Sequence, residues 1–190
     1  MAGSYSLRLS IMSYNMHGFN QGSTMLYDIC NQNCQDIIFI QEHWLSSALI
    51  DKILCISANY VGYGISAMEA ALSINILKGR PFGGTAVLVK NKYAKLCSSI
   101  LTFDRVVSLV ICNVLFINTY MPCEDGSIAS LDCLQEILAN VTDIVEQSSH
   151  EYIVFGGDLN VNLFNKSAHS LAINDFLSEY KLTIVQRGNV

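Results

Sequence analysis

One stretch decides the fold of this chain: Tyr152-Ile153-Val154-Phe155-Gly156-Gly157-Asp158-Leu159-Asn160. Residues 153–155 are β-branched or aromatic, which predicts a short buried strand, and the two glycines allow the backbone to turn or to approach a ligand closely. In an extended continuation, Asp158 and Asn160 would point to the same side of the chain. Taken alone, the stretch is better explained by an Asx turn after a strand, which Asp and Asn often form.

Three other apolar runs end on polar residues in the same way. Residues 9–14 lead to Asn15, residues 36–40 lead to Gln41-Glu42, and residues 114–119 lead to Tyr120-Met121-Pro122. In α/β folds the carboxyl ends of neighbouring strands open onto a common crevice where ligands bind. We therefore expect an α/β fold in which five polar side chains gather at one crevice: Asn15, Glu42, Tyr120, Asp158 and Asn160.

The composition indicates a single, well-packed domain. The chain has 190 residues, of which 51% are hydrophobic and only 14% charged, so we expect residues 1–190 to form one domain with a large core. No apolar run reaches the roughly 18 residues of a transmembrane helix, and no membrane partner is expected. The N-terminal residues lack the apolar segment of a signal peptide. Seven cysteines without a Cys-x-x-Cys pair indicate reduced, buried thiols. We expect an intracellular protein, nuclear or cytoplasmic and not secreted.

The charge distribution bears on nucleic-acid binding in two opposite ways. A net charge of -5 counts against a protein that binds nucleic acid mainly by charge. However, five of the eleven basic residues fall between positions 78 and 95, where no acidic residue occurs. Lys78, Arg80 and Lys90 in this cluster are candidate substrate-binding residues. A solvated sheet edge protected by lysines explains the cluster equally well.

The remaining elements follow from periodicity and turn residues. Apolar spacing predicts helices over residues 23–34, 48–54, 128–145 and 171–180. Strands are expected over residues 85–89 and 182–185, and an antiparallel pair over 106–111 and 114–120 with a turn at Cys112-Asn113. Residues 62–80 contain three glycines and little periodicity, so we expect a long irregular connection there.

The expected group of polar side chains suits a hard cation and a phosphate. Mg²⁺ prefers oxygen ligands and needs only one or two protein carboxylates besides substrate phosphates, and Glu42 is the first choice for this ligand. Hydrolysis also requires a carboxylate that activates water and donors that stabilise the phosphoryl charge. Asp158 fits the base, Asn160 and Asn15 the orienting groups, and Tyr120 the donor. For Asn15 an ordinary turn, and for Tyr120 a strand ended by proline, are the structural alternatives.

Five segments in this order resemble the endonuclease/exonuclease/phosphatase superfamily. They are Ser13-Tyr14-Asn15-Met16-His17-Gly18, Ile40-Gln41-Glu42-His43-Trp44-Leu45, Gly83-Gly84-Thr85-Ala86, Asn118-Thr119-Tyr120-Met121-Pro122 and Gly156-Gly157-Asp158-Leu159-Asn160-Val161. Within the superfamily the chain is most similar to the apurinic-type endonuclease domain of non-LTR (LINE-like) retrotransposons. Gly79-Arg80-Pro81-Phe82-Gly83-Gly84 and the His-Trp-Leu after Glu42 carry that closer resemblance.

The resemblance implies a four-layer αββα sandwich of two mixed β-sheets with helices outside, and phosphodiester cleavage that depends on Mg²⁺ or Mn²⁺. Glu42 and Asn15 would be metal-site residues, with Glu42 the principal ligand. Tyr120 would contact the phosphate or the leaving group, Asp158 would activate the attacking water, and Asn160 would orient it. DNA is the implied substrate. In the retrotransposon branch such a domain nicks target DNA to expose a 3′ hydroxyl for a downstream reverse transcriptase.

The sequence departs from the family pattern in one respect. The pattern ends with a Ser-Asp-His segment whose histidine binds the scissile phosphate, and no such segment occurs in these 190 residues. We therefore expect a domain that is incomplete at the C-terminus, lacks its last strands, leaves a sheet edge unpaired, and is weakly active or inactive. Two alternatives stay open: a catalytically dead remnant that serves as a fold or binding module, and a phosphatase or phosphodiesterase acting on inositol phosphates or lipid headgroups.

Overall fold

Two four-stranded sheets form the centre of the protein. The computed structural model describes residues 8–66 and 82–185. The first sheet has the order β1 (Ile11–Asn15), β2 (Ile37–Gln41), β4 (Thr85–Lys90) and β3 (Tyr60–Ile65). The second has the order β5 (Cys97–Phe103), β6 (Val106–Ile111), β7 (Val114–Tyr120) and β8 (Tyr152–Asp158). β1 runs parallel to β2 and β7 to β8, while the other pairs are antiparallel, so both sheets are mixed.

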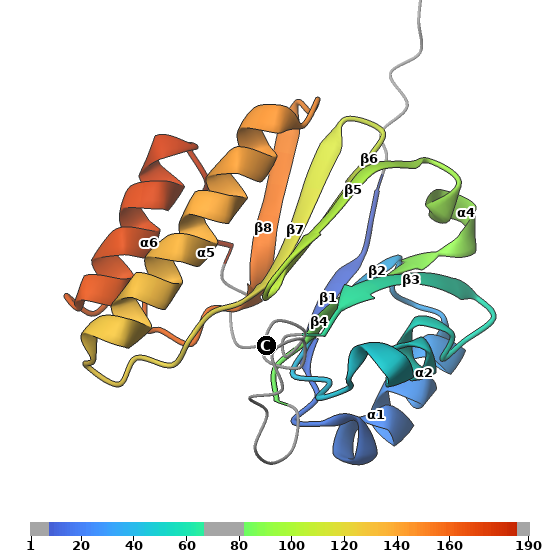
Figure 1. Ribbon diagram of the computed structural model, residues 1–190. Coiled ribbons are helices and arrows are strands. Elements are labelled where there is room, and N and C mark those ends of the chain that lie inside the picture. The colour runs from blue at the N-terminus through green and yellow to red at the C-terminus, as the bar shows by residue number, and fades with distance from the viewer. Residues whose placement is uncertain (1–7, 67–81, 186–190) are drawn as a thin grey trace, which may run out of the picture.

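The sheets pack face to face, and helices cover their outer faces (Figure 1). α1 (Phe19–Gln32) and α2 (Asp51–Leu54) lie on the first sheet, and α5 (Ile128–Gln147) and α6 (Ala168–Glu179) lie on the second. The short helices η1 (Ser47–Leu49) and α4 (Asn91–Ala94) lie in connections. This arrangement confirms the expected αββα sandwich.

The apolar character of β2 follows from its position between two layers. All five of its residues are buried, and alternate side chains point to opposite faces. Ile38 and Ile40 pack in the cluster beneath α1, whereas Ile37 and Phe39 pack against the second sheet, where Val107 and Phe116 meet them. A strand that is buried on both faces has a continuous apolar sequence, so β2 could be predicted from its sequence.

Several other predictions about elements are confirmed. The helix expected over residues 128–145 is α5, and the helix expected over 171–180 is α6. The antiparallel pair is β6 and β7, with Cys112 at φ 58° in the turn between them. The seven cysteines are all free, but only Cys30 is buried, so the expectation of buried thiols was wrong for most of them.

Two strands, β3 and β5, were not predicted, because apolar and polar residues do not alternate along their sequences. β3 lies at the start of the segment expected to be irregular, and the rest of that segment is outside the described residues. Gly62 in β3 faces α2, where an added Cβ would lie 2.5 Å from the Leu54 Cα, so the helix approaches the strand only because glycine is there. β5 is exposed along most of its length and its register shifts between Ser98 and Leu101.

The strand expected over residues 182–185 does not form. The Leu182 N–H donates to the Leu177 carbonyl at 2.8 Å, which ties the segment to the end of α6, and Val185 is 92% exposed. Within the described residues β8 pairs only with β7 and is an edge of its sheet. No helix in residues 8–66 or 82–185 is both long and apolar enough to cross a bilayer.

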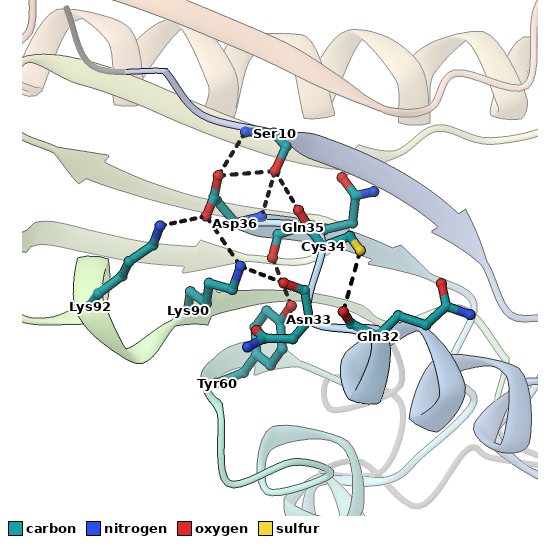
Figure 2. Close-up of polar contacts among 9 residues, drawn as sticks. All are labelled: Ser10, Gln32, Asn33, Cys34, Gln35, Asp36, Tyr60, Lys90 and Lys92. Atoms are coloured by element: carbon teal, nitrogen blue, oxygen red, sulfur yellow. Dashed lines mark hydrogen bonds and ion pairs between the residues drawn. The ribbon is translucent and has the colours of Figure 1, made fainter.

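A polar network joins three strands at the end of the first sheet where β2 begins (Figure 2). The Asp36 carboxylate accepts hydrogen bonds from the Ser10 backbone N–H at 3.0 Å and the Ser10 hydroxyl at 2.9 Å. It also pairs with Lys92 at 3.1 Å and Lys90 at 3.5 Å. Burial disfavours the ionised form, but the hydrogen bonds from Ser10 and Lys92 outweigh it and lower the pKa of Asp36 to about 2.

We predict that Asp36→Asn destabilises the fold by about 1–2 kcal/mol at neutral pH, because the charge-assisted bonds from Ser10 and Lys92 weaken. The ordinary pKa of 3.8 falls to about 2 on folding, so the stabilisation is complete above pH 4 and is lost as the pH falls toward 2. Urea unfolding across this range measures the difference. Asp28→Asn, at an exposed position on α1, is the control, and an equal effect of both changes would contradict the prediction.

Candidate active site

The carboxyl ends of the two parallel strand pairs meet at one edge of the sandwich. Asn15 at the end of β1 is in register with Gln41, and Asp158 at the end of β8 is in register with Tyr120. The Asn15 amide Nδ2 donates to Glu42 Oε1 at 2.7 Å and to Asp158 Oδ2 at 2.6 Å. One amide group thus links carboxylates that come from different sheets.

Two Asx turns orient this cluster. The His17 N–H donates to Asn15 Oδ1 at 3.0 Å, and the Asn160 N–H donates to Asp158 Oδ1 at 3.1 Å. The His17 N–H must face the oxygen of the Asn15 amide, and the two carboxylates must face its NH₂ group. These contacts therefore define the orientation of the Asn15 amide. The Asx turns offered as alternatives to a site are present, and they are part of its construction.

The turn at Asp158 changes the position expected for Asn160. The chain does not continue in an extended conformation, because Asn160 has φ 49°. The Asn160 Nδ2 donates to the Met121 carbonyl at 2.9 Å, and the Met121 N–H donates to the Asp158 carbonyl at 2.9 Å. Asn160 therefore ties the end of β8 to the segment after β7.

Glu42 lies in a confined position directly after β2. Its side chain is 13% exposed, and its φ is 54°. The Trp44 indole N–H donates to Glu42 Oε2 at 3.2 Å, and His17 Nδ1 lies 3.7 Å from the same oxygen. The two neighbours of Glu42, His17 and Trp44, also border an open cavity of about 450 Å³, together with Lys52.

His43 supports this loop and stays neutral. The Leu45 N–H donates to its Nδ1 at 3.0 Å, so the proton is on Nε2, which donates to the Ile65 carbonyl at 3.1 Å. Burial lowers the pKa of His43 to about 4. A fully buried imidazole with both nitrogens engaged holds the backbone between Glu42 and Leu45 in place.

A buried amide pair beneath the cluster was missed in the sequence. The Gln41 Nε2 donates to Asn118 Oδ1 at 2.6 Å, and the Asn118 Nδ2 donates to the carbonyls of Ile40 at 3.0 Å and Ala86 at 2.9 Å. Asn118 is fully buried on β7, so these bonds cross from one sheet to the other. The signal was available, because Asn118 directly follows the apolar residues 114–117 within a strand that the sequence predicted.

Tyr120 lies at the end of β7, beside Asp158 in the register of the sheet. Burial raises the pKa of Tyr120 to about 12, with the negative charge of Glu42 adding to the shift and Arg105 opposing it. The phenol therefore keeps its proton at neutral pH and can act as a hydrogen-bond donor.

Lys90, one of the three candidate substrate-binding residues, is not part of this cluster. Lys90 is at the opposite end of the first sheet, roughly 15 Å away at the usual rise of the five residues of β2. Its amino group donates to the Asn33 carbonyl at 2.7 Å and pairs with Asp36 (Figure 2). In this structure Lys90 makes structural contacts and does not face the expected site. The reason is that β4 runs antiparallel to β2, so the last residue of β4 lies at the end of the sheet away from the cluster. Lys78 and Arg80 lie outside the described residues.

The donor set suits a hard divalent cation. Within residues 8–66 and 82–185 neither Glu42 nor Asp158 has a lysine or arginine partner. The same residues contain no cluster of three or more His, Cys, Asp or Glu side chains that could hold a metal. One or two carboxylates are the number that Mg²⁺ uses when phosphate oxygens complete its shell. The Asn15 amide presents its nitrogen to the carboxylates, which favours a hydrogen-bonding role for Asn15 over the expected role as a metal ligand.

The two glycines before Asp158 differ in their tolerance. A Cβ on Gly156 would contact only Phe39, at 3.6 Å, whereas Gly157 has φ 123° and a Cβ there would overlap the Thr119 carbonyl.

We predict that Gly157→Ala lowers the free energy of unfolding by about 3 kcal/mol and displaces Asp158. Gly156→Ala is the matched control and should cost under about 1 kcal/mol. Equal effects in urea unfolding would contradict this distinction.

We also predict that Asn15→Asp destabilises the protein by about 2 kcal/mol in EDTA, because a donor between two carboxylates becomes a third carboxylate. Urea unfolding is the measurement. Asn20→Asp, at an exposed position in the first turn of α1, should be neutral or slightly stabilising. Unchanged stability of Asn15→Asp would show that the bridge contributes nothing.

Comparison with known proteins gives matches at the level of structure. No protein-family model matches the chain, and no curated protein matches it either. The 3′ phosphatase NExo from Neisseria, solved with a product DNA hairpin, is 13% identical with a TM-score of 0.69, covering 90% of this chain and 71% of that one. An AP endonuclease from Archaeoglobus fulgidus is 17% identical with a TM-score of 0.61 and the same coverage. The AP endonuclease LMAP from Leishmania major is 14% identical with a TM-score of 0.64, covering 88% and 65%. The chain therefore shares the endonuclease/exonuclease/phosphatase fold of these proteins.

Proposed function

We propose that the chain belongs to the endonuclease/exonuclease/phosphatase superfamily and hydrolyses phosphodiester bonds of DNA with the help of Mg²⁺ or Mn²⁺. The observation that carries the proposal is the Asn15 amide, which holds the carboxylates of Glu42 and Asp158 at 2.7 and 2.6 Å from one nitrogen. Two carboxylates that have no lysine or arginine partner in the described residues form a site that needs a positive ion before an anionic phosphate can enter. The fold shared with a DNA 3′ phosphatase and AP endonucleases supports DNA as the substrate.

Each site residue has a role in this proposal. Asp158 accepts the proton of the attacking water, whose oxygen bonds to phosphorus as the P–O3′ bond breaks. The departing O3′ takes up a proton to become the 3′ hydroxyl, and the phosphate stays on the 5′ side. Tyr120, still protonated, donates a hydrogen bond to the phosphate. Glu42 would hold the cation, which neutralises charge on the phosphoryl group. Asn15 and Asn160 keep the two carboxylates and the Asp158 corner in place.

The finer proposal is that the chain derives from a non-LTR retrotransposon and nicks target DNA to expose a 3′ hydroxyl for a reverse transcriptase. The five ordered motifs and the Gly-Arg-Pro-Phe-Gly-Gly run support it. We also propose that these 190 residues act slowly, because no Ser-Asp-His segment is present in them to bind the phosphate.

Nicking of supercoiled plasmid tests the proposed activity. We expect open circles in Mg²⁺ and none in EDTA, and we expect Asp158→Asn and Glu42→Gln each to reduce the rate by about 100-fold or more. Asp175→Asn, at an exposed position on α6, is the control.

Nicking that survives in Asp158→Asn would identify a contaminating nuclease and contradict the assignment. If plasmid is not nicked, a panel of abasic duplex, DNA with a 3′ phosphate and inositol polyphosphate separates a different substrate from a binding module. Cleavage of the inositol compound alone would overturn DNA as the substrate.

A further inference from the structure

The turn between β5 and β6 places an arginine in a strained conformation next to the site. Val106 pairs with Phe103 on one side and with Thr119 on the other, so the turn lies at the same sheet end as Tyr120 and Asp158. Arg105 has φ 63°. Glycine or asparagine is favoured at such left-handed positions, because a Cβ there is crowded by the backbone. Strain of this kind is a reason to look for a function of the side chain.

The Arg105 guanidinium stacks on the site tyrosine. Its Cζ lies 5.1 Å from the centroid of the Tyr120 ring, a cation–π distance. The Tyr120 N–H donates to the Arg105 carbonyl at 3.0 Å, which attaches the turn to the end of β7. Backbone and side chain of Arg105 are thus both fixed relative to Tyr120.

No group in the described parts of the chain forms an ion pair or a side-chain hydrogen bond with the Arg105 guanidinium. Within residues 8–66 and 82–185 the guanidinium stacks on the Tyr120 ring, and its charge opposes the rise that burial causes in the pKa of Asp104. Asp104 lies near enough to feel the Arg105 charge but forms no ion pair with it. The negative charge of Glu42 also reaches Tyr120, and Asp158 is its partner in the sheet register. The Arg105 residue is only partly exposed, and no acceptor in the described residues takes a hydrogen bond from its side-chain N–H groups.

We infer that Arg105 binds a phosphodiester of the DNA strand through its guanidinium N–H groups, while its stacking contact holds the Tyr120 ring. This inference rests on the proposed function and adds a substrate-binding residue that none of the sequence motifs contains. A guanidinium is suited to the role, because its planar set of donors matches the non-bridging oxygens of a phosphate. The positive charge of Arg105 beside Tyr120 also offsets the repulsion between the anionic DNA strand and the two carboxylates.

Binding of a fluorescein-labelled DNA duplex in EDTA tests the inference without cleavage. We expect Arg105→Gly to weaken binding by about 10-fold and to reduce the slope of log K against log salt by about 1. Its melting temperature should equal or exceed that of the parent chain, because glycine removes the strain. Arg105→Lys keeps the charge but loses the planar donors, so its affinity should be intermediate.

Lys181→Gly is a matched control. Lys181 is an exposed cation with φ 54° at the end of α6, outside the site cluster, so the change removes the same charge and the same strain. It should leave binding unchanged. If Arg105→Gly binds DNA with the affinity and the salt slope of the parent chain, the inference is wrong while the proposed function stands. The same conclusion follows if its melting temperature falls enough to account for weaker binding. An absence of DNA binding by the parent chain would overturn the proposed function and the inference together.

Discussion

Amide side chains hold the two sheets in register at the end where the polar cluster lies. Asn15 bonds both Glu42 and Asp158, the latter 143 positions away in the sequence, and beneath it Gln41 and Asn118 bond across the buried interface. Without such partners, polar groups at this depth would carry a desolvation cost that the apolar packing around them does not offset. A sliding or rotation of one sheet against the other would leave several of these groups unpaired, so the network restricts the sandwich to one relative position.

The apolar layers supply cohesion but little specificity of this kind. Residues such as Phe39 and Phe116 fill the space between the sheets, and burial of this sort is non-directional. Hydrogen bonds with defined donors and acceptors distinguish between positions that apolar contacts accept almost equally. The same groups that align the sheets also orient the carboxylates, so the geometry of the cluster and the alignment of the fold depend on each other.

Five of the nine described non-glycine residues with positive φ lie at the same end of the molecule. Positive φ occurs at His17, Glu42, Trp44, Arg105 and Asn160, all in loops that surround the cluster. None of these is glycine, so each carries a conformational cost that the surrounding contacts must maintain. The buried neutral His43, which bonds the Leu45 N–H and the Ile65 carbonyl, is one such contact. These loops therefore have a local cost in stability, and their strained backbone directs side chains toward the polar cluster.

Much of the fold and part of the site could be predicted from the sequence, because they depend on local patterns. Apolar runs located β2, β4, β6, β7 and β8, the three- and four-residue spacing located α5, and the polar residues after four strands identified Asn15, Glu42, Tyr120 and Asp158. The strands β3 and β5 could not be found, since Gly62 and the exposed face of β5 make sense only beside their neighbours.

What only the tertiary structure decided were the directions and partners of the side chains. Sequence determined that an amide, two carboxylates and a phenol follow strands of one sandwich, because strand ends are marked by local chemistry. It did not determine that the Asn15 nitrogen faces both carboxylates, that Lys90 lies at the opposite end, or that Arg105 covers Tyr120. Each of these depends on strand order and on parallel or antiparallel register, which are set by contacts between residues far apart in the chain.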